Sequence, residues 1–104
     1  IRPPGHHAGS QRQAGFCLFN NVACAAKFAQ HKFPNKCRKV LIVDWDVHHG
    51  DGTEQIFAED PNVLFISVHR SDEGRFYPAK RGLANHVGRK EGKRFTVNIP
   101  LVRV

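Results

Sequence analysis

Side chains that could do chemistry are concentrated in one short segment, Asp44-Trp45-Asp46-Val47-His48-His49-Gly50-Asp51-Gly52. It follows residues 40–43, an apolar and β-branched run that is typical of a buried strand. Alternate side chains of an extended chain share a face, so we expect Asp44, Asp46 and His48 to project to the same side. Two carboxylates and an imidazole at the carboxyl end of a strand favour half a metal site over a strand that merely ends in a polar turn.

A second group of candidate residues lies in a stiff loop near the start of the chain, which presents two adjacent imidazoles, His6 and His7. Pro3 and Pro4 fix φ and remove backbone donors, and Gly5 permits a tight bend. A lone histidine is usually structural, and a pair could be a surface accident. The rigid approach favours presentation into a cleft, which is what we predict for this pair.

The composition limits the class of protein. Sixteen Lys and Arg against nine Asp and Glu give a net charge of +7, which permits binding to nucleic acid or acidic surfaces. The basic residues are scattered in pairs without interleaved aromatic residues, so we interpret them as a solvated surface. Three cysteines without Cys-x-x-Cys spacing argue against a zinc ribbon or a disulfide framework. They fit a reducing compartment, and we expect Cys17 and Cys24 to pack as small hydrophobic residues.

The hydrophobic pattern predicts a parallel sheet with helices on its faces, because apolar strand-like runs alternate with short helical segments. A helix should begin at Asn20 or Asn21, with Asn as its N-cap, and Pro34 should end any continuation. The other predicted elements are a strand over 39–47, a short helix over 53–58, a strand over 63–68, a loop over 71–87, a basic turn over 88–93 and a strand over 95–102. Ligands of such folds bind at the carboxyl ends of the strands, where Asp46, His48 and the loop after Val68 should meet.

Five motifs follow one another along the chain: Arg2-Pro3-Pro4-Gly5-His6-His7-Ala8, Gly15-Phe16-Cys17, Asn20-Asn21, residues 43–52 and Ser67-Val68-His69-Arg70. Together they resemble the catalytic domain of zinc-dependent histone deacetylases in its class II form. The resemblance implies the arginase/deacetylase fold, a three-layer α/β/α sandwich around a mostly parallel sheet. Residues 1–104 would be the central part of one catalytic domain, truncated at both ends. The implied activity is hydrolysis of Nε-acetyl-lysine in histones or other proteins.

An amide carbonyl is a poor electrophile and neutral water is a poor nucleophile, and Zn²⁺ answers both problems. The resemblance implies attack by zinc-bound water, with Asp46 and His48 as two zinc ligands and a third, an aspartate, outside the chain. Oxygen and nitrogen donors suit Zn²⁺, although Fe²⁺ or Co²⁺ could occupy the same set. The family's oxyanion donor, Tyr or His, also lies outside the chain. We therefore expect these 104 residues by themselves to be inactive.

The resemblance makes His6 and His7 the paired imidazoles beside the metal. His7 would be the general base, and His6 would assist electrostatically or in proton transfer to the leaving amine. Each would be oriented by a carboxylate, His6 by Asp44 and His7 by Asp51. A hydrogen bond at one ring nitrogen fixes the tautomer and raises the basicity of the other nitrogen.

An acetyl-lysine side chain is long and neutral and needs a narrow apolar tunnel, which aromatic walls suit. Gly15 and Phe16 match one wall in the family, and Tyr77 matches the other, where Phe is commoner. For His49 and His69, which lie nearby, we expect structural roles. The family also has a structural monovalent-cation site, which we expect to hold K⁺. The backbone carbonyls that match it belong to Asp44, Asp46, His48, Ser67 and Val68.

Three functions remain open from the sequence. The first is a lysine deacetylase of the nucleus or the cytoplasm that regulates chromatin and represses transcription. It would have co-repressor or other protein partners, no direct sequence-specific contact with nucleic acid and no membrane association. The second is a deacetylase of acetylated polyamines, since those relatives share the same His-rich motifs. The third is a non-catalytic basic module that keeps the fold to bind partners. The intact histidines and aspartates of the motifs speak against this third reading.

Overall fold

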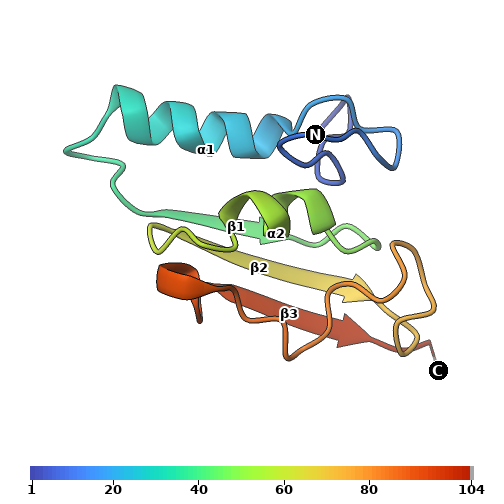
Figure 1. The fold of residues 1–104 in the computed structure, drawn as a ribbon. Coiled ribbons are helices and arrows are strands. Elements are labelled where there is room, and N and C mark those ends of the chain that lie inside the picture. The colour runs from blue at the N-terminus through green and yellow to red at the C-terminus, as the bar shows by residue number, and fades with distance from the viewer. Residues whose placement is uncertain (104) are drawn as a thin grey trace.

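The computed structural model describes residues 1–103, which form a sheet of parallel strands with helices beside it (Figure 1). Along this range the elements are α1 (Asn21–Lys32), β1 (Val40–Asp44), α2 (Asp51–Phe57), β2 (Val63–Arg70), a 3₁₀ helix η1 (Lys90–Gly92) and β3 (Thr96–Leu101). The strand order is β1-β2-β3, and both neighbouring pairs are parallel. The α/β class with a parallel sheet is thus confirmed.

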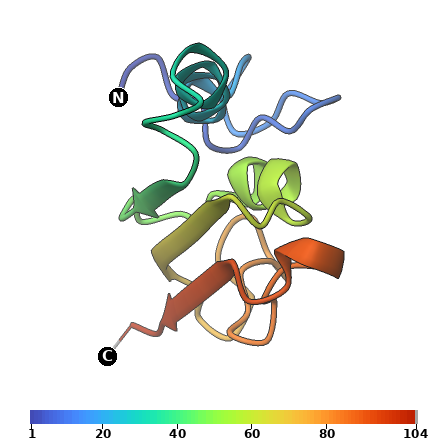
Figure 2. The same cartoon turned by 90° about the vertical axis from the view of Figure 1, so that its left-hand side faces the viewer.

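Both helices lie on the same side of the sheet (Figures 1 and 2). The core between them consists of Ala23, Ala26, Ile42, Phe57, Val63 and Phe65. Ala23 and Ala26 allow α1 to approach the other core residues closely. Phe57 of α2 and Phe65 of β2 are the large side chains of the same core. Within residues 1–103 the helices supply one layer on the sheet. No helix in this range is long and apolar enough to cross a membrane.

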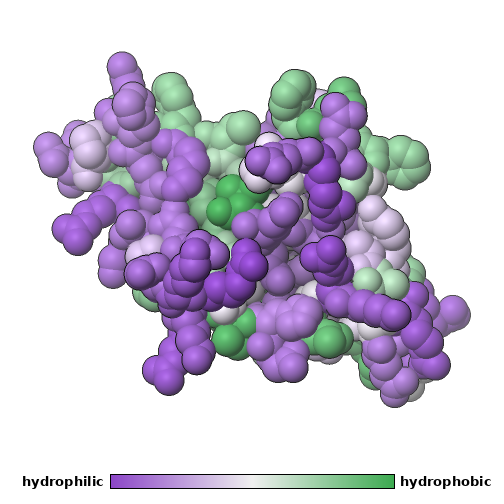
Figure 3. Space-filling model, viewed as in Figure 1, coloured by the Kyte–Doolittle hydropathy of each residue, from purple (hydrophilic) through white to green (hydrophobic). Residues whose placement is uncertain are grey.

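The two surfaces of the sheet differ in chemistry. Apolar side chains on the strand positions that alternate with the core are exposed: Leu41, Val43, Val97, Ile99 and Leu101. The face seen in Figure 3, which carries the helices, is instead covered mainly by hydrophilic residues with smaller hydrophobic areas between them. Nearly all Lys and Arg residues are exposed, as predicted for a solvated surface, while the bare strand face is apolar.

The first strand is shorter than the prediction of 39–47, because β1 ends at Asp44. Asp46 and His48 lie in the loop that follows, so the turn of this loop, and not strand alternation, brings Asp46 to the side of Asp44, where both carboxylates approach His6. Asp44 Oδ1 accepts a hydrogen bond from the Asp46 amide at 3.1 Å, and Asp46 Oδ1 accepts one from the His48 amide at 2.8 Å. Such bonds from Asp to the backbone two residues ahead compete with the strand ladder and turn the chain.

Other boundaries differ by a few residues. The second helix begins at Asp51 and not at residue 53, because its first turn is stabilised by contacts with a distant loop. The second strand continues past Val68 to Arg70, whose amide donates to the Val47 carbonyl at 2.9 Å. Both extensions depend on partners far away in sequence, which local patterns do not contain.

The two cysteines near α1 have different environments. Cys17 is buried, as predicted, and its Sγ lies 3.4 Å from the Gly15 carbonyl oxygen. Cys24 is exposed, so the prediction that it packs in the core is wrong. Ala23 and Ala26 form the buried side of α1, and Cys24 lies on its outer side.

Asn20 links the start of α1 to two other segments, and it is buried. Its Oδ1 caps the helix by accepting from the Ala23 amide at 3.0 Å. Its Nδ2 donates to the Ala8 carbonyl at 3.1 Å and to the Thr53 hydroxyl at 3.0 Å. The predicted N-cap is confirmed, and the same side chain also holds the loop that carries His6 and His7 against α2.

We predict that Asn20→Ala lowers the free energy of unfolding of the protein that contains this chain by about 1–3 kcal/mol, because a helix cap and buried hydrogen bonds are lost together. Asn21→Ala is the matched control. Asn21 is the next residue, and its one side-chain bond, to the Pro3 carbonyl, is exposed. The control should change stability by less than about 0.5 kcal/mol in urea denaturation. Equal losses for the two variants would contradict the linking role of Asn20.

Candidate active site

The start of α2 holds the loop that carries the paired histidines. The amides of Gly52 and Thr53 both donate to the His6 carbonyl oxygen, at 3.0 and 3.1 Å. A Cβ on Gly52 would lie 2.3 Å from the Ala8 carbonyl oxygen, so a larger residue would force the two segments apart. This close approach places the ring of His7 beside the first turn of α2.

Two His–Asp pairs result. His6 Nδ1 lies 2.8 Å from Asp44 Oδ2, and His7 Nδ1 lies 2.8 Å from Asp51 Oδ1. A carboxylate can only accept, so Nδ1 donates in each pair and Nε2 keeps its lone pair in the neutral ring. The two ring centroids are 4.1 Å apart. The structure thus brings together the four residues that the resemblance implied as catalytic.

Hydrogen bonds and neighbouring charges shift the pKa of one member of each pair. Burial alone would lower the pKa of His6, but its hydrogen bond to Asp44 and the negative charges around it raise that pKa above its ordinary value. Burial alone would raise the pKa of Asp51, but hydrogen bonds from His7 and Arg12 and their charges lower it below its ordinary value. Asp51 is therefore a carboxylate over the ordinary pH range, although its side chain is only 4% exposed.

The two predicted metal ligands are adjacent and partly exposed. Asp46 Oδ1 lies 3.2 Å from His48 Nδ1 and 3.8 Å from His6 Nε2. The first distance is close to the separation of about 3.3 Å expected for two donors that are each bound at 2.0–2.1 Å to one tetrahedral Zn²⁺. The donor pair thus fits zinc. Across residues 1–103, no three His, Cys, Asp or Glu side chains form a cluster that could hold a metal.

Aromatic rings border this group. Tyr77 contacts His7 and His48 edge-on, with centroid distances of 5.0 and 5.9 Å. The ring of Phe76 stacks on that of His48 with a centroid distance of 5.1 Å. The Arg70 guanidinium carbon lies 4.3 Å from the centroid of the Phe76 ring. The contact of Phe76 with His48 could not be predicted from the sequence, although Phe76-Tyr77 is the bulky pair of its loop.

The two residues predicted for the opposite wall, Gly15 and Phe16, have different environments. The Phe16 side chain is 98% exposed, and its backbone has φ 63°. The preceding Gly15 lies against His7, where an added Cβ would be 2.3 Å from the imidazole Cδ2. Gly15 therefore supports the position of His7 directly, while the ring of Phe16 projects into solvent.

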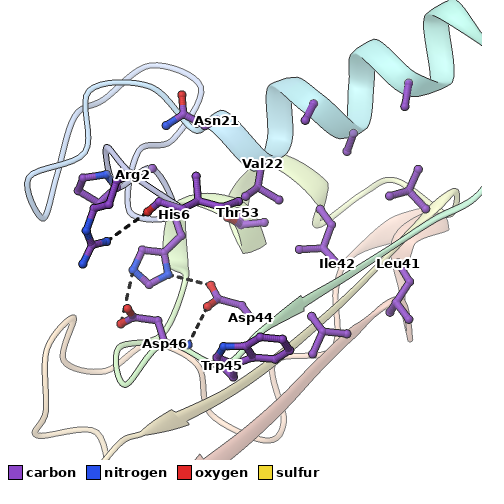
Figure 4. A pocket seen from close by; sticks show the side chains of 18 residues that line it. Arg2, His6, Asn21, Val22, Leu41, Ile42, Asp44, Trp45, Asp46 and Thr53 are labelled. Carbon is purple, nitrogen blue, oxygen red and sulfur yellow. Dashed lines mark hydrogen bonds and ion pairs between the residues drawn. The ribbon is translucent and has the colours of Figure 1, made fainter.

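A groove of about 660 Å³ between α1 and β1 reaches one side of the histidine pair. Figure 4 shows the His6 ring between the carboxylates of Asp44 and Asp46, with apolar side chains such as Val22 and Ile42 farther along the groove. His7, His48 and Tyr77 are not among its lining residues. The groove and the surface bordered by Tyr77 are thus separate approaches to the site.

A second polar group is buried behind the loop of the site. His49 Nε2 pairs with Glu54 Oε2 at 2.9 Å, and Asn98 Nδ2 donates to the same oxygen at 2.7 Å. The ring of His69 lies 4.7 Å from that of His49, and its Nε2 is held 2.9 Å from the Gly82 carbonyl oxygen. Burial and the neighbouring His49 lower the pKa of His69. These contacts stabilise the fold around the site and leave His49 and His69 out of it.

The predicted monovalent-cation site is only partly assembled from regular structure. Asp44 and Ser67 lie opposite each other in neighbouring strands, and Ser67 Oγ is 2.9 Å from His69 Nδ1. Asp46 and His48 belong to the loop after β1. The involvement of their carbonyls and that of Val68 stays a prediction.

Comparison with known proteins agrees with the motifs. The family model of the histone deacetylase domain matches residues 1–103. The chain is 54% identical to histone deacetylase 4 of Caenorhabditis elegans over 100 residues, which are 96% of this chain and 11% of that protein. It is 54% identical to histone deacetylase clr3 of Schizosaccharomyces pombe over 101 residues, 96% of this chain and 15% of that protein.

A solved structure agrees as well. The crystal structure of the HDA15 HD domain matches 96% of this chain with a TM-score of 0.89 and 53% sequence identity, and the match covers 27% of that structure's chain. The chain thus spans only a small part of the relatives it matches. With a family model over nearly all its residues and a matching fold, this chain belongs to the histone deacetylase family.

Proposed function

We propose that this chain forms part of the active site of a metal-dependent amidohydrolase that removes acetyl groups from Nε-acetyl-lysine of histones or other proteins. One observation carries the proposal. Two His–Asp pairs, His6–Asp44 and His7–Asp51, lie directly beside the partly exposed donor pair of Asp46 and His48. Family membership supports deacetylation as the reaction.

Asp46 and His48 would hold the metal through an oxygen and a nitrogen, with the third ligand supplied from outside this chain. The donor distance of 3.2 Å supports Zn²⁺, although Fe²⁺ or Co²⁺ would accept the same donors. Bound there, the ion would polarise the acetyl carbonyl and make a water molecule more acidic. K⁺ would be structural and would be held by the backbone carbonyls of the five residues named above, Asp44, Asp46, His48, Ser67 and Val68.

His7 would act as the general base. Its Nδ1 donates to Asp51, which leaves Nε2 free to accept a proton from the attacking water. Because Asp51 is buried, its hydrogen bond keeps the His7 ring in one orientation. His6, held in the same way by Asp44, would assist electrostatically and deliver a proton to the leaving amine.

Tyr77 would border the acetyl-lysine side chain, since its ring already contacts both His7 and His48. Its hydroxyl would add a polar group at the rim of the substrate passage. Phe16 would close the other side once substrate covers its exposed ring, because aromatic faces hold methylene groups well. Acetylated lysines of histones or other proteins would be the substrates, and family membership supports an activity in the nucleus or the cytoplasm.

We predict that Asp46→Ala and His48→Ala, each in the full-length protein, remove zinc together with activity, because too few ligands remain for a stable site. Zinc per protein is measured after purification and dialysis. His31→Ala, in the last turn of α1 and exposed, is the control and should keep zinc and activity. Stoichiometric zinc in either site variant would show that its residue is not a ligand.

His7→Ala should behave differently from the ligand variants. We expect it to lower kcat on an acetyl-lysine peptide about 10²–10⁴-fold, which is the typical contribution of a general base. Zinc content should stay at the level of the unmodified protein, because His7 is not assigned as a ligand. Turnover within a few-fold of the unmodified protein would mean that another group takes the proton.

A further inference from the structure

Arg12 shares the carboxylate that orients His7. One oxygen of Asp51, Oδ1, accepts from His7 Nδ1 at 2.8 Å, and the other, Oδ2, accepts from Nη2 of Arg12. The Asp51 side chain is 4% exposed and that of Arg12 is 41% exposed. The Arg12 guanidinium thus covers the Asp51 carboxylate on its solvent side, while the buried His7 imidazole contacts it on the inner side.

The loop around Arg12 is built to hold it there. The Gly9 amide donates to the Arg12 carbonyl at 3.0 Å, and Ala14 and Cys17 exchange two backbone bonds that close the following turn. Gly9 lies between Gln55 of α2 and Arg12, where an added Cβ would be 2.1 Å from Gln55 Oε1 and 3.4 Å from Arg12 Cγ. The loop that carries Arg12 is therefore packed closely against α2, the helix that carries Asp51.

Loss of Arg12 would leave Asp51 Oδ2 buried and charged without its donor. An anionic oxygen in that state is costly, and the carboxylate can relieve the cost by turning toward water or toward backbone amides. Either movement takes Oδ1 away from His7 Nδ1. Because the histidine ring is oriented through that bond, the lone pair on its Nε2 would no longer be held in one direction.

We propose that Arg12 is a positioning residue of this active site, which acts on His7 through the Asp51 carboxylate. The inference rests on the proposed function, because it assigns Arg12 to the general base of that reaction. Arg12 contacts neither of the assigned metal ligands by any bond recorded among residues 1–103. Its effect should therefore appear in turnover and not in metal content.

The test uses the full-length protein with zinc bound and an acetyl-lysine peptide as substrate. The variants are Arg12→Ala, Arg12→Lys, Asp51→Asn and the double variant of Arg12→Ala with Asp51→Asn. Arg89→Ala is the matched control, because Arg89 also pairs with a carboxylate, Glu59, but at an exposed site far along the chain. For each protein kcat, KM, zinc content and the midpoint of thermal unfolding are measured.

We expect Arg12→Ala to lower kcat about 10- to 100-fold, the usual range for residues that orient a site histidine, with KM changed less than about threefold. Zinc content should not change. Arg12→Lys, which keeps a donor and a charge, should recover most of the loss. In the Asp51→Asn background, Arg12→Ala should lower kcat by less than about twofold further, because two residues that act through one bond are not additive. The control should match the unmodified protein.

Three results would overturn the inference. They are a kcat of Arg12→Ala within about twofold of the unmodified protein, a rise in KM with kcat unchanged, and an undiminished effect of Arg12→Ala in the Asp51→Asn background. The second result would make Arg12 a substrate contact. If Arg12→Ala does not fold, Arg12→Gln, which removes the charge but keeps most of the side-chain length, takes its place in both backgrounds. A kcat of Arg12→Gln within about twofold of the unmodified protein then decides against the inference. An unmodified protein that carries zinc without deacetylating the peptide would instead contradict the proposed function.

Discussion

The arrangement of the site depends on one close contact between backbones. The first amides of α2 bond the carbonyl oxygen of His6, and this is possible only because residue 52 has no side chain to separate the two segments. The contact joins a loop near residue 7 to a helix near residue 52. Once it is made, each imidazole faces a carboxylate, and Asn20 secures the same junction from α1. The geometry of the proposed site is thus a consequence of packing between main chains.

Much of the fold could be predicted from local patterns. The strands were visible as apolar runs, and α1 was visible from its Asn cap and the spacing of its alanines, because these signals act within a few residues. The end of β1 was not visible. There the side chains of Asp44 and Asp46 bond backbone amides two positions ahead, and the chain turns earlier than hydrophobicity alone suggests. Cys24 was misplaced because its neighbours supply the buried side of α1.

The site could be predicted in part, and the reason lies in the kind of information each residue carries. The two histidine motifs have distinctive residue types at fixed spacing, so the resemblance identified His6, His7, Asp44 and Asp51 without a structure. Arg12 and Phe76 carry no such signal. Each contacts a partner that lies tens of residues away, Asp51 for the arginine and His48 for the ring, and only the folded chain brings those partners together.

The neighbouring residues His48 and His49 face two separate environments. His48 lies among the groups of the open site, while His49 is sealed in the polar cluster with Glu54 and Asn98. The backbone between these two residues separates the open site from the sealed cluster. A survey of random substitutions scored only by loss of the proposed deacetylation would therefore report Glu54 and Asn98 beside the residues of the proposed site. A second measurement, such as cellular abundance, would separate the two sets. Substitutions in the sealed cluster should lower abundance, and substitutions in the open site should not.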